Sequence, residues 1–381
     1  MRGMTRLGGG VACAVLAVTA VAAGCGGSEP SGGDPGAGTP PPGRAAPNPA
    51  TSSTTPKSDL QVGLVTDVGG VGDLSFNMMA NQGLELAQAE LGVKPTLVES
   101  SQAADYSSNL ERLVEKGCKL IFAVGFSLAD AVKEVAGRHP DVHFAIIDSD
   151  GPAAPNVSNL VFREEEGSFL VGLLAGGTSR SGKVGFVGGM EIPLIKRFEA
   201  GFRAGVKTAK PAAVVSARYT NNWIDVAKGK ELALSLFEEG ADVVMHAAGQ
   251  CGVGVIEAAR QKGAGFWAIG VDADQDYLGT ADPKAPKPPS RVLTSMMKRV
   301  DKAVFDTCKA EVEGKFVGGK RSFGVKEAGV GPSPLTYTKA DLPAKLLQEV
   351  ERLKQAVAKG ELQLPTKVEE VAGWQAPTVT L

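Results

Sequence analysis

The sequence predicts an α/β protein with two lobes, each built on a doubly wound parallel sheet, and a hinge that joins them. The first observation is an alternation of apolar runs with amphipathic helical stretches, which begins at Asp59. The apolar runs are continuous, as expected for strands that helices cover on both faces. The second observation is an internal match, in which one order of elements recurs later in the chain. A chain of 381 residues is also long enough for two domains.

The N-terminus has the features of a secretory signal. Arg2 and Arg6 form a positive start, and the uncharged stretch 7–24 ends in small residues before Cys25. The pattern predicts a signal peptide over residues 1–24 and lipidation of Cys25. An ordinary signal peptide and a short membrane anchor are the alternatives. Residues 25–58 would be the lipidated cysteine and a disordered tether, because their Gly, Pro, Ser and Thr residues bury little apolar surface.

After the tether, periodicity predicts the elements of the two lobes. Strands are expected at 60–66, 95–99, 120–125, 143–148, 183–188, 213–219, 242–248 and 266–272, with a further one at 291–295. Helices are expected at 75–91, 105–117, 127–138, 164–178, 194–208, 226–239, 252–263 and 297–313, with a last one from Ala340 to Lys359. This alternation is typical of βαβ units.

The internal match supports two similar lobes. Segment 120–150 aligns without gaps with segment 244–274. Both segments run in the order apolar strand, glycine-containing loop, helix, apolar strand and Asp-x-Asp. The alignment pairs Gly125 with Gly249, Asp148 with Asp272, and Asp150 with Asp274. Identities are few, so the shared order of elements carries the inference.

The lobes are expected to be discontinuous in sequence. One would comprise 59–162 and about 274–314, the other 163–273 and about 315–340, and the tail 341–381 would pack on a lobe. Ligands of open α/β sheets sit at the carboxyl ends of the strands. Two facing lobes would gather these ends around one cleft and close on a ligand there.

Composition excludes several classes of function. With 43% hydrophobic and 22% charged residues and a net charge of about -2, nothing indicates a nucleic-acid partner. Cys118, Cys251 and Cys308 remain after export, an odd number; one disulfide is possible, but the sequence does not assign it. We expect no metal and no cofactor, because there is no CxxC and the chain has three histidines.

Two segments resemble enzyme motifs but lack residues or companion motifs that those enzymes require. "GTSRSGKV" at 177–184 has the spacing of a phosphate loop, but Val184 replaces the hydroxyl residue, and a helix precedes the loop. "SMMK" at 295–298 lacks the companion motifs of penicillin-binding enzymes. Without a nucleophile-and-base set, we expect no enzyme.

Five longer motifs carry a family resemblance. They are "TDVGGVGDLSFN", "GFVGGMEIPLIKRFEAGFRAGV", "NNWIDVAKGKELA", "HAAGQCGVGVIEAA" and "AIGVDADQ", in that order within about 59–335. Together they resemble the basic membrane protein family of lipoproteins, similar to the purine nucleoside receptors of ABC importers. The resemblance implies a type I periplasmic-binding-protein fold with a nucleoside held between the lobes.

The resemblance also implies which residues contact the base. Phe76 and Trp223 match the two aromatics that sandwich it, although either ring could be ordinary core. Asp67 would accept hydrogen bonds from the base edge, and Asp148 would reach the ligand from its strand end. Asn77 is also expected in the ligand site. Some members of the family carry Asn where this chain has Val68, which leaves the base preference open.

The family pattern places the ribose on Asp272 and Lys298. A carboxylate can accept from two vicinal hydroxyls, and a lysine would donate to the same groups. A turn cap and a solvated helix residue are the alternative roles. Gly249 and Gly252 would let backbone N–H groups approach the ligand, or serve turn geometry only.

Three further residues near these motifs have structural interpretations. Asp73 and Ser75 flank the start of a helix, where both residue types are preferred caps. His246 lies within a strand and is expected to be packed and hydrogen-bonded rather than catalytic.

The sequence therefore predicts an exported, lipid-anchored binding protein. It would be a monomer that captures a nucleoside, with purine favoured, and passes it to the permease and ATPase of an ABC importer. The protein would contact the membrane only through its lipid, on the periplasmic or outer face. A sensory or adhesive surface lipoprotein and a sugar-type binding protein on the same fold are the alternatives.

Overall fold

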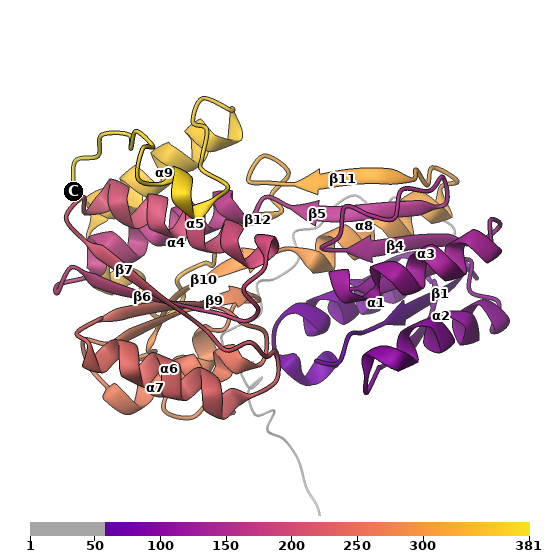
Figure 1. Cartoon of the computed structure of the whole chain (residues 1–381), viewed down its shortest axis with the longest axis horizontal. Helices are drawn as coiled ribbons and strands as arrows, with labels where there is room; N and C mark the ends of the chain where they lie inside the picture. The colour runs from indigo at the N-terminus through magenta and orange to yellow at the C-terminus, as the bar shows by residue number, and fades with distance from the viewer. Residues whose placement is uncertain (1–57) are drawn as a thin grey trace, which may run out of the picture. The chain divides into compact units, whose positions relative to one another are not determined.

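Two six-stranded sheets carry the fold of the computed structural model, which describes residues 58–381 (Figure 1). The first sheet, lobe I, has the order β11-β5-β4-β3-β1-β2 and is wholly parallel. Its strands are β1 (Gln61–Val65), β2 (Lys94–Val98), β3 (Leu120–Val124), β4 (His143–Ile147), β5 (Val157–Phe162) and β11 (Gly319–Phe323).

The second sheet, lobe II, repeats this plan with the order β12-β10-β9-β8-β6-β7. Its strands are β6 (Lys183–Gly188), β7 (Val214–Tyr219), β8 (Val243–Ala247), β9 (Trp267–Asp272), β10 (Val292–Lys298) and β12 (Val330–Pro332). Only β12 is antiparallel to its neighbour. Strands β3 and β4 occupy the same places in lobe I as β8 and β9 in lobe II, which agrees with the internal match in the sequence.

Helices pack in pairs beside the two sheets. In lobe I, α1 packs on α8 and α2 on α3; these helices are α1 (Phe76–Leu91), α2 (Tyr106–Glu115), α3 (Ala129–Arg138) and α8 (Val300–Val312). In lobe II, α4 packs on α5 and α6 on α7; these are α4 (Glu164–Thr178), α5 (Pro193–Ala209), α6 (Val226–Glu238) and α7 (Cys251–Lys262). The α/β class and the two doubly wound lobes are confirmed.

The structure differs from the sequence prediction at the strands in the second half of each sheet. Strands β5, β11 and β12 were not expected, since "VSNLVF" and "GKRSF" mix polar with apolar residues and β12 has three residues. Strand β10 continues through Lys298, where a helix was expected, and α8 begins at Val300.

The division between lobes is also different from the expected one. The expected lobe I segment 274–314 contains β10, which belongs to the sheet of lobe II, and the expected lobe II segment 315–340 contains β11, which belongs to lobe I. The chain therefore passes between the sheets after β5, after β10 and after β11. An apolar run identifies a strand, but it does not tell which of two similar sheets the strand joins.

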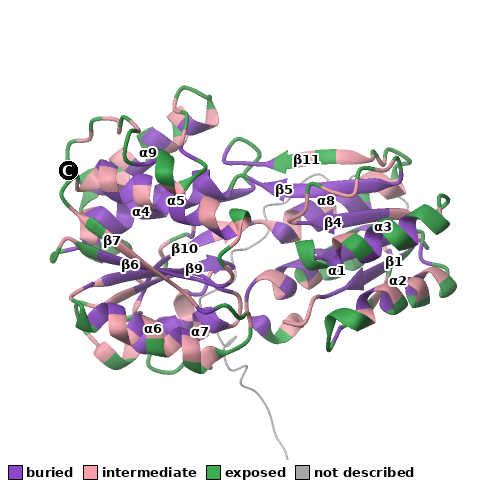
Figure 2. Cartoon of the chain, viewed as in Figure 1, coloured by how far each residue is buried: buried purple, intermediate pink, exposed green. Residues whose placement is uncertain are grey.

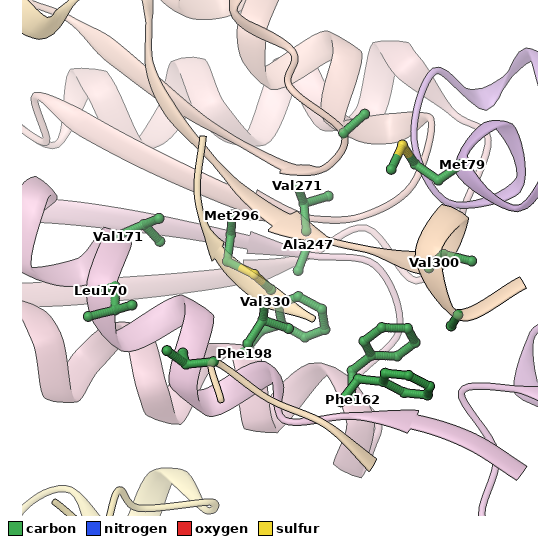
Figure 3. Close-up of a cluster of buried hydrophobic side chains, with 14 of the residues drawn as sticks. Met79, Phe162, Leu170, Val171, Phe198, Ala247, Val271, Met296, Val300 and Val330 are labelled. Atoms are coloured by element: carbon green, nitrogen blue, oxygen red, sulfur yellow. The ribbon is translucent and has the colours of Figure 1, made fainter. Parts of the chain in front are cut away.

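The buried residues lie mainly along the inner strands of the two sheets and on the helices that pack against them (Figure 2). One buried cluster includes residues of both lobes, and Figure 3 shows a part of it, which contains Val271 and Met296 from lobe II and Phe162 from lobe I. A second cluster lies within lobe I and a third is formed mainly by lobe II. The lobes are therefore joined by a shared apolar core as well as by the three chain passages.

The C-terminal segment lies on lobe II. Helix α9 (Ala344–Ala358) packs on α4, and the Trp374 ring meets Phe169 of α4 edge-on at 6.0 Å between centroids. Lys207 of α5 donates to the carbonyl groups of Val371, Ala372 and Trp374 at 2.9–3.0 Å. The segment thus covers the α4–α5 pair.

Two sequence questions are answered within residues 58–381. Cys118, Cys251 and Cys308 are buried free thiols, so the possible disulfide is not formed. No helix in this described part of the chain is long and apolar enough to cross a membrane.

The close contact between α4 and α5 can be tested at Gly205. A Cβ there would lie 2.1 Å from the backbone oxygen of Phe169, so Gly205→Ala would push the helices apart. We expect a loss of about 1–3 kcal/mol in the free energy of unfolding, measured in urea. Gly137→Ala, at an exposed α3 position with nothing within 4 Å, is the control and should raise stability by up to about 1 kcal/mol. Equal stability of the two variants would contradict this account.

Candidate functional site

A cavity lies where the carboxyl ends of strands from both sheets meet. The space between its walls is about 620 Å³, including the solvent-filled mouth. From lobe I it is lined by Asp67, Gly69, Asp73, Phe76, Asn77, Gly125, Phe126 and Asp148. From lobe II it is lined by Leu194, Ile195, Phe198, Trp223, Ala247, Ala248, Gly249, Gln250, Val271, Asp272 and Lys298. Every residue predicted for the ligand site is among them except Gly252.

The turn between β1 and α1 is held by two acids. Asp67 Oδ1 accepts from the backbone N–H of Gly69 and from the Asn77 side chain, each at 2.8 Å. Asp73 accepts from the backbone N–H groups of Ser75, Asn77 and Met78 at 2.8–3.1 Å, and so caps α1 as expected. Burial raises the pKa of both carboxyls above the ordinary value. The turn thereby fixes Phe76 as the first residue of the helix.

Ser75 does not act as the predicted side-chain cap. Its Oγ donates to Asp272 Oδ2 at 2.6 Å, and no capping hydrogen bond from this side chain is formed. The reason is that Asp73 already occupies the free N–H groups of the first turn. The Ser75 hydroxyl therefore reaches the other lobe.

Lys298 is buried at the end of β10 among carboxylates of both lobes. Its Nζ pairs with Asp148 Oδ2 at the end of β4 and lies 3.5 Å from Glu164 Oε1 at the start of α4. It also lies 5.0–5.5 Å from the ring centroids of Phe76, Phe162 and Phe198. Burial works to lower the pKa of Lys298, but Asp148 and Glu164 outweigh it, and the pKa is raised. The residue stays an ammonium group and is not a solvated helix residue.

The acids around this ammonium group are themselves perturbed. Burial raises the pKa of Asp272 to about 6, against the opposing effect of Lys298. Burial likewise raises the pKa of Glu164 to about 7, although Lys298 opposes the shift and Arg197 Nε donates to Glu164 Oε2 at 3.0 Å. Three carboxylates thus surround one lysine, and burial brings the pKa of one of them, Glu164, to about 7.

Aromatic rings form much of the remaining wall. Phe76 comes from lobe I and Trp223 from the loop after β7 in lobe II. Gly189 makes room for the indole, since a Cβ there would lie 2.2 Å from it. Sequence reasoning missed Phe126, whose ring meets Trp223 edge-on at 6.5 Å, and Phe198 of α5. Both follow ordinary helical or loop patterns, so only the place of Phe126 just after the Gly125 loop could have indicated it.

Gly249 and Gly252 have different roles in the geometry. Gly249 lines the cavity with a left-handed backbone, φ 54°. Gly252 does not line the cavity. It packs against His246 instead, since a Cβ at this position would lie 2.0 Å from that ring. His246 is packed as expected: its Nε2 lies 3.0 Å from Gln275 Oε1, and burial lowers its pKa to about 4.

Within the described residues, no group of three or more His, Cys, Asp or Glu side chains could hold a metal ion. What the site offers is a set of rings, hydrogen-bond acceptors and one ammonium group inside a largely apolar cavity. This is the composition of a pocket for a small organic ligand.

Comparison with known proteins decides the family. A model of the ABC transporter substrate-binding proteins described as PnrA-like matches residues 60–368. The chain belongs to this PnrA-like family. Its fold and its place as a substrate-binding component of an ABC importer agree with the sequence prediction, which is confirmed.

Relatives of the PnrA-like chain cover most of its length. The CD4+ T-cell-stimulating antigen of Listeria monocytogenes is 38% identical over 81% of this chain and 89% of its own. The ABC transporter nucleoside-binding protein BmpA of Lactococcus lactis is 33% identical over 94% of this chain and 98% of its own. A solute-binding protein structure from Aeropyrum pernix has a TM-score of 0.74 at 30% identity, and covers 82% of this chain and 98% of its own.

The buried acid Glu164 gives this PnrA-like protein a testable pH dependence. Between its ordinary pKa of 4.5 and the folded value of about 7, the folded protein holds a proton that the unfolded chain has released. The free energy of unfolding should therefore fall as pH rises through this window. We expect E164Q, which keeps the shape but cannot titrate, to show a smaller fall in urea unfolding from pH 4.5 to 7. Equal slopes in both proteins would contradict the assignment.

Proposed function

We propose that the chain captures a nucleoside in this cavity and delivers it to the permease and ATPase of an ABC importer. The observation that carries the proposal is that Phe76 and Trp223, from different lobes, line one cavity together with Asp272 and Lys298. Two rings can stack on the faces of a base, and a carboxylate beside an ammonium group suits the vicinal hydroxyls of ribose. The name of the Lactococcus lactis relative, a nucleoside-binding protein, supports the same class of ligand.

The base edge would meet the acids of lobe I. Asp67 Oδ1 is occupied by Gly69 and Asn77, which leaves Oδ2 to accept from an N–H group of the base. Asp148 would add an acceptor from the end of β4, and the Gly249 backbone would approach the ligand from lobe II. The two-ring width of a purine would use more of the aromatic wall, which is why a purine nucleoside is favoured.

The charge of the cavity favours an uncharged ligand. Asp67, Asp73, Asp148 and Asp272 line it, whereas Lys298 is the one basic residue in the lining drawn from residues 58–381. A phosphate group would meet these carboxylates without a second cation to neutralise it. A nucleoside, with hydroxyl and N–H donors and no charge, would meet acceptors instead.

Export and anchoring complete the proposal. The signal peptide 1–24, the lipidated Cys25 and the tether up to residue 58 fall almost wholly outside the described residues, and they rest on the sequence pattern. The protein would act as a monomer on the periplasmic or outer face of a membrane. It would perform no catalysis, because its work is to bind and release.

Titration of residues 26–381 with nucleosides tests the ligand. We expect heat of binding in calorimetry with inosine, guanosine or adenosine, weaker binding of cytidine, and none of ribose by itself. The reason is that ribose lacks the base, which would supply the stacking of roughly 1–3 kcal/mol per ring. Absence of heat with every nucleoside would remove the proposal.

Replacing each aromatic residue by alanine tests whether the base stacks on the two rings. Phe76→Ala and Trp223→Ala should each weaken nucleoside binding about 5- to 150-fold, the equivalent of roughly 1–3 kcal/mol. Trp267→Ala is the matched control, because Trp267 also belongs to lobe II but does not line the cavity. A ligand of the sugar class would depend much less on the two rings.

The anchor is tested by fractionation of cells that express the full chain. We expect the wild-type chain in the membrane fraction and Cys25→Ser in the soluble extracytoplasmic fraction, because the thioether linkage to the lipid requires the cysteine sulfur. The Cys118→Ser variant is the control and should stay with the membrane. Equal partition of wild type and Cys25→Ser would contradict lipidation at Cys25.

A further inference from the structure

The turn between Asp73 and Phe76 touches lobe II through two adjacent residues. Ser75 Oγ donates to Asp272 Oδ2 at 2.6 Å, and both side chains are buried. The backbone oxygen of Leu74 accepts from Gln275 Nε2 at 3.0 Å. Each bond joins a residue of the β1–α1 turn to a residue at or just after β9. Any separation of the two sheets at this point would break both.

Each partner is fixed within its own lobe. Gln275 is fully buried, and its Oε1 accepts from the backbone N–H of Val271 and lies 3.0 Å from His246 Nε2. Its amide is thus aimed at Leu74 by lobe II itself. On the other side, Leu74 has a left-handed backbone, φ 55°, which Asp73 stabilises through the cap of α1. The Leu74 side chain packs against the apolar cluster of lobe II.

The orientation of Asp272 depends on this contact. Asp272 also has a left-handed backbone, φ 64°, at the end of β9, and it lines the cavity. Among the described residues, Ser75 is the one side chain that donates a hydrogen bond to its carboxylate. Lys298 stabilises the charge, but its Nζ is paired with Asp148. A carboxylate without the serine would be free to rotate about its last torsion.

We propose that Ser75 is a positioning residue for Asp272, and that the Ser75–Asp272 and Leu74–Gln275 bonds form a latch between the lobes. Ser75 itself does not line the cavity, so it acts through Asp272 rather than on the ligand. The acid that would take the ribose hydroxyls is then aligned only when the lobes are together. The part of this inference that concerns the ligand rests on the proposed function.

Ser75→Ala tests the positioning role by nucleoside titration of the full chain. Because hydrogen bonds to charged groups are strong, we expect binding to weaken about 10- to 100-fold. In an Asp272→Asn background the same change should have little effect, since residues that act through one another are not additive. Ser158→Ala is the matched control: it removes a buried hydroxyl of lobe I that has no partner, and should leave binding unchanged.

The pH dependence of nucleoside binding distinguishes a positioning role of Ser75 from a simple loss of packing, which would not shift it. The Ser75 hydrogen bond lowers the pKa of Asp272, while burial raises it. Its removal should shift the acid limb of nucleoside binding to higher pH in Ser75→Ala. An unshifted limb, or the same fold loss with and without Asp272, would overturn the positioning role.

The latch has a test that needs no ligand. Small-angle scattering of the ligand-free chain should give a larger radius of gyration for Ser75→Ala and Gln275→Ala than for wild type and Ser158→Ala. Equal radii in all four would overturn the latch. If the wild type bound no nucleoside, the proposed function would fall, and the scattering result would still decide whether the latch exists.

Discussion

The site depends on the burial of one ammonium group between two sheets. Lys298 ends a strand of lobe II, yet its ion-pair partner Asp148 ends a strand of lobe I, and Glu164 approaches from the first turn of α4. A buried charge is tolerated only when partners replace the lost water, and removal of one partner is strongly destabilising. The charge therefore ties the arrangement of the lobes to the chemistry of the cavity. Two of the chain passages between the lobes, after β5 and after β10, lie next to Glu164 and Lys298 in sequence.

The two sheets share one plan, which places Asp148 and Asp272 at equivalent positions. The lobes differ at the next strand, where a single lysine is introduced. Asp148 and Asp272 follow corresponding strands and both have left-handed backbones, with φ 63° and 64°. The next strands, β5 and β10, also correspond, but one ends in Phe162 and the other in Lys298. The ring of Phe162 lies 5.0 Å from the ammonium group. Lys298 thus gives the two corresponding acids one shared cation, which pairs with Asp148 and stabilises the charge of Asp272.

The sequence predicted the parts of this architecture that local patterns encode. Apolar runs located nine of the strands, β1 to β4 and β6 to β10, and the cap at Asp73 follows from residue preferences within one turn. Contacts between residues far apart in the chain could not be predicted from the sequence. The hydroxyl of Ser75 bonds to a carboxylate 197 positions away instead of its own helix, and the polar strand β11 is recognisable only beside β5. Phe198 and Glu164 have ordinary helical surroundings in sequence, and the fold alone brings them to Lys298.

The balance of charge links these contacts to the choice of ligand. Four carboxylates line the cavity, those of Asp67, Asp73, Asp148 and Asp272, and the protein satisfies their acceptors only in part. Asp148 Oδ1, for example, is buried without a hydrogen-bond partner. Unsatisfied buried acceptors disfavour the empty closed state and favour a ligand that brings hydrogen-bond donors. A nucleoside brings hydroxyl and N–H groups without adding negative charge. The acids that make closure costly without a ligand would make it favourable with one, and the Ser75–Asp272 and Leu74–Gln275 latch offsets part of that cost by joining the lobes.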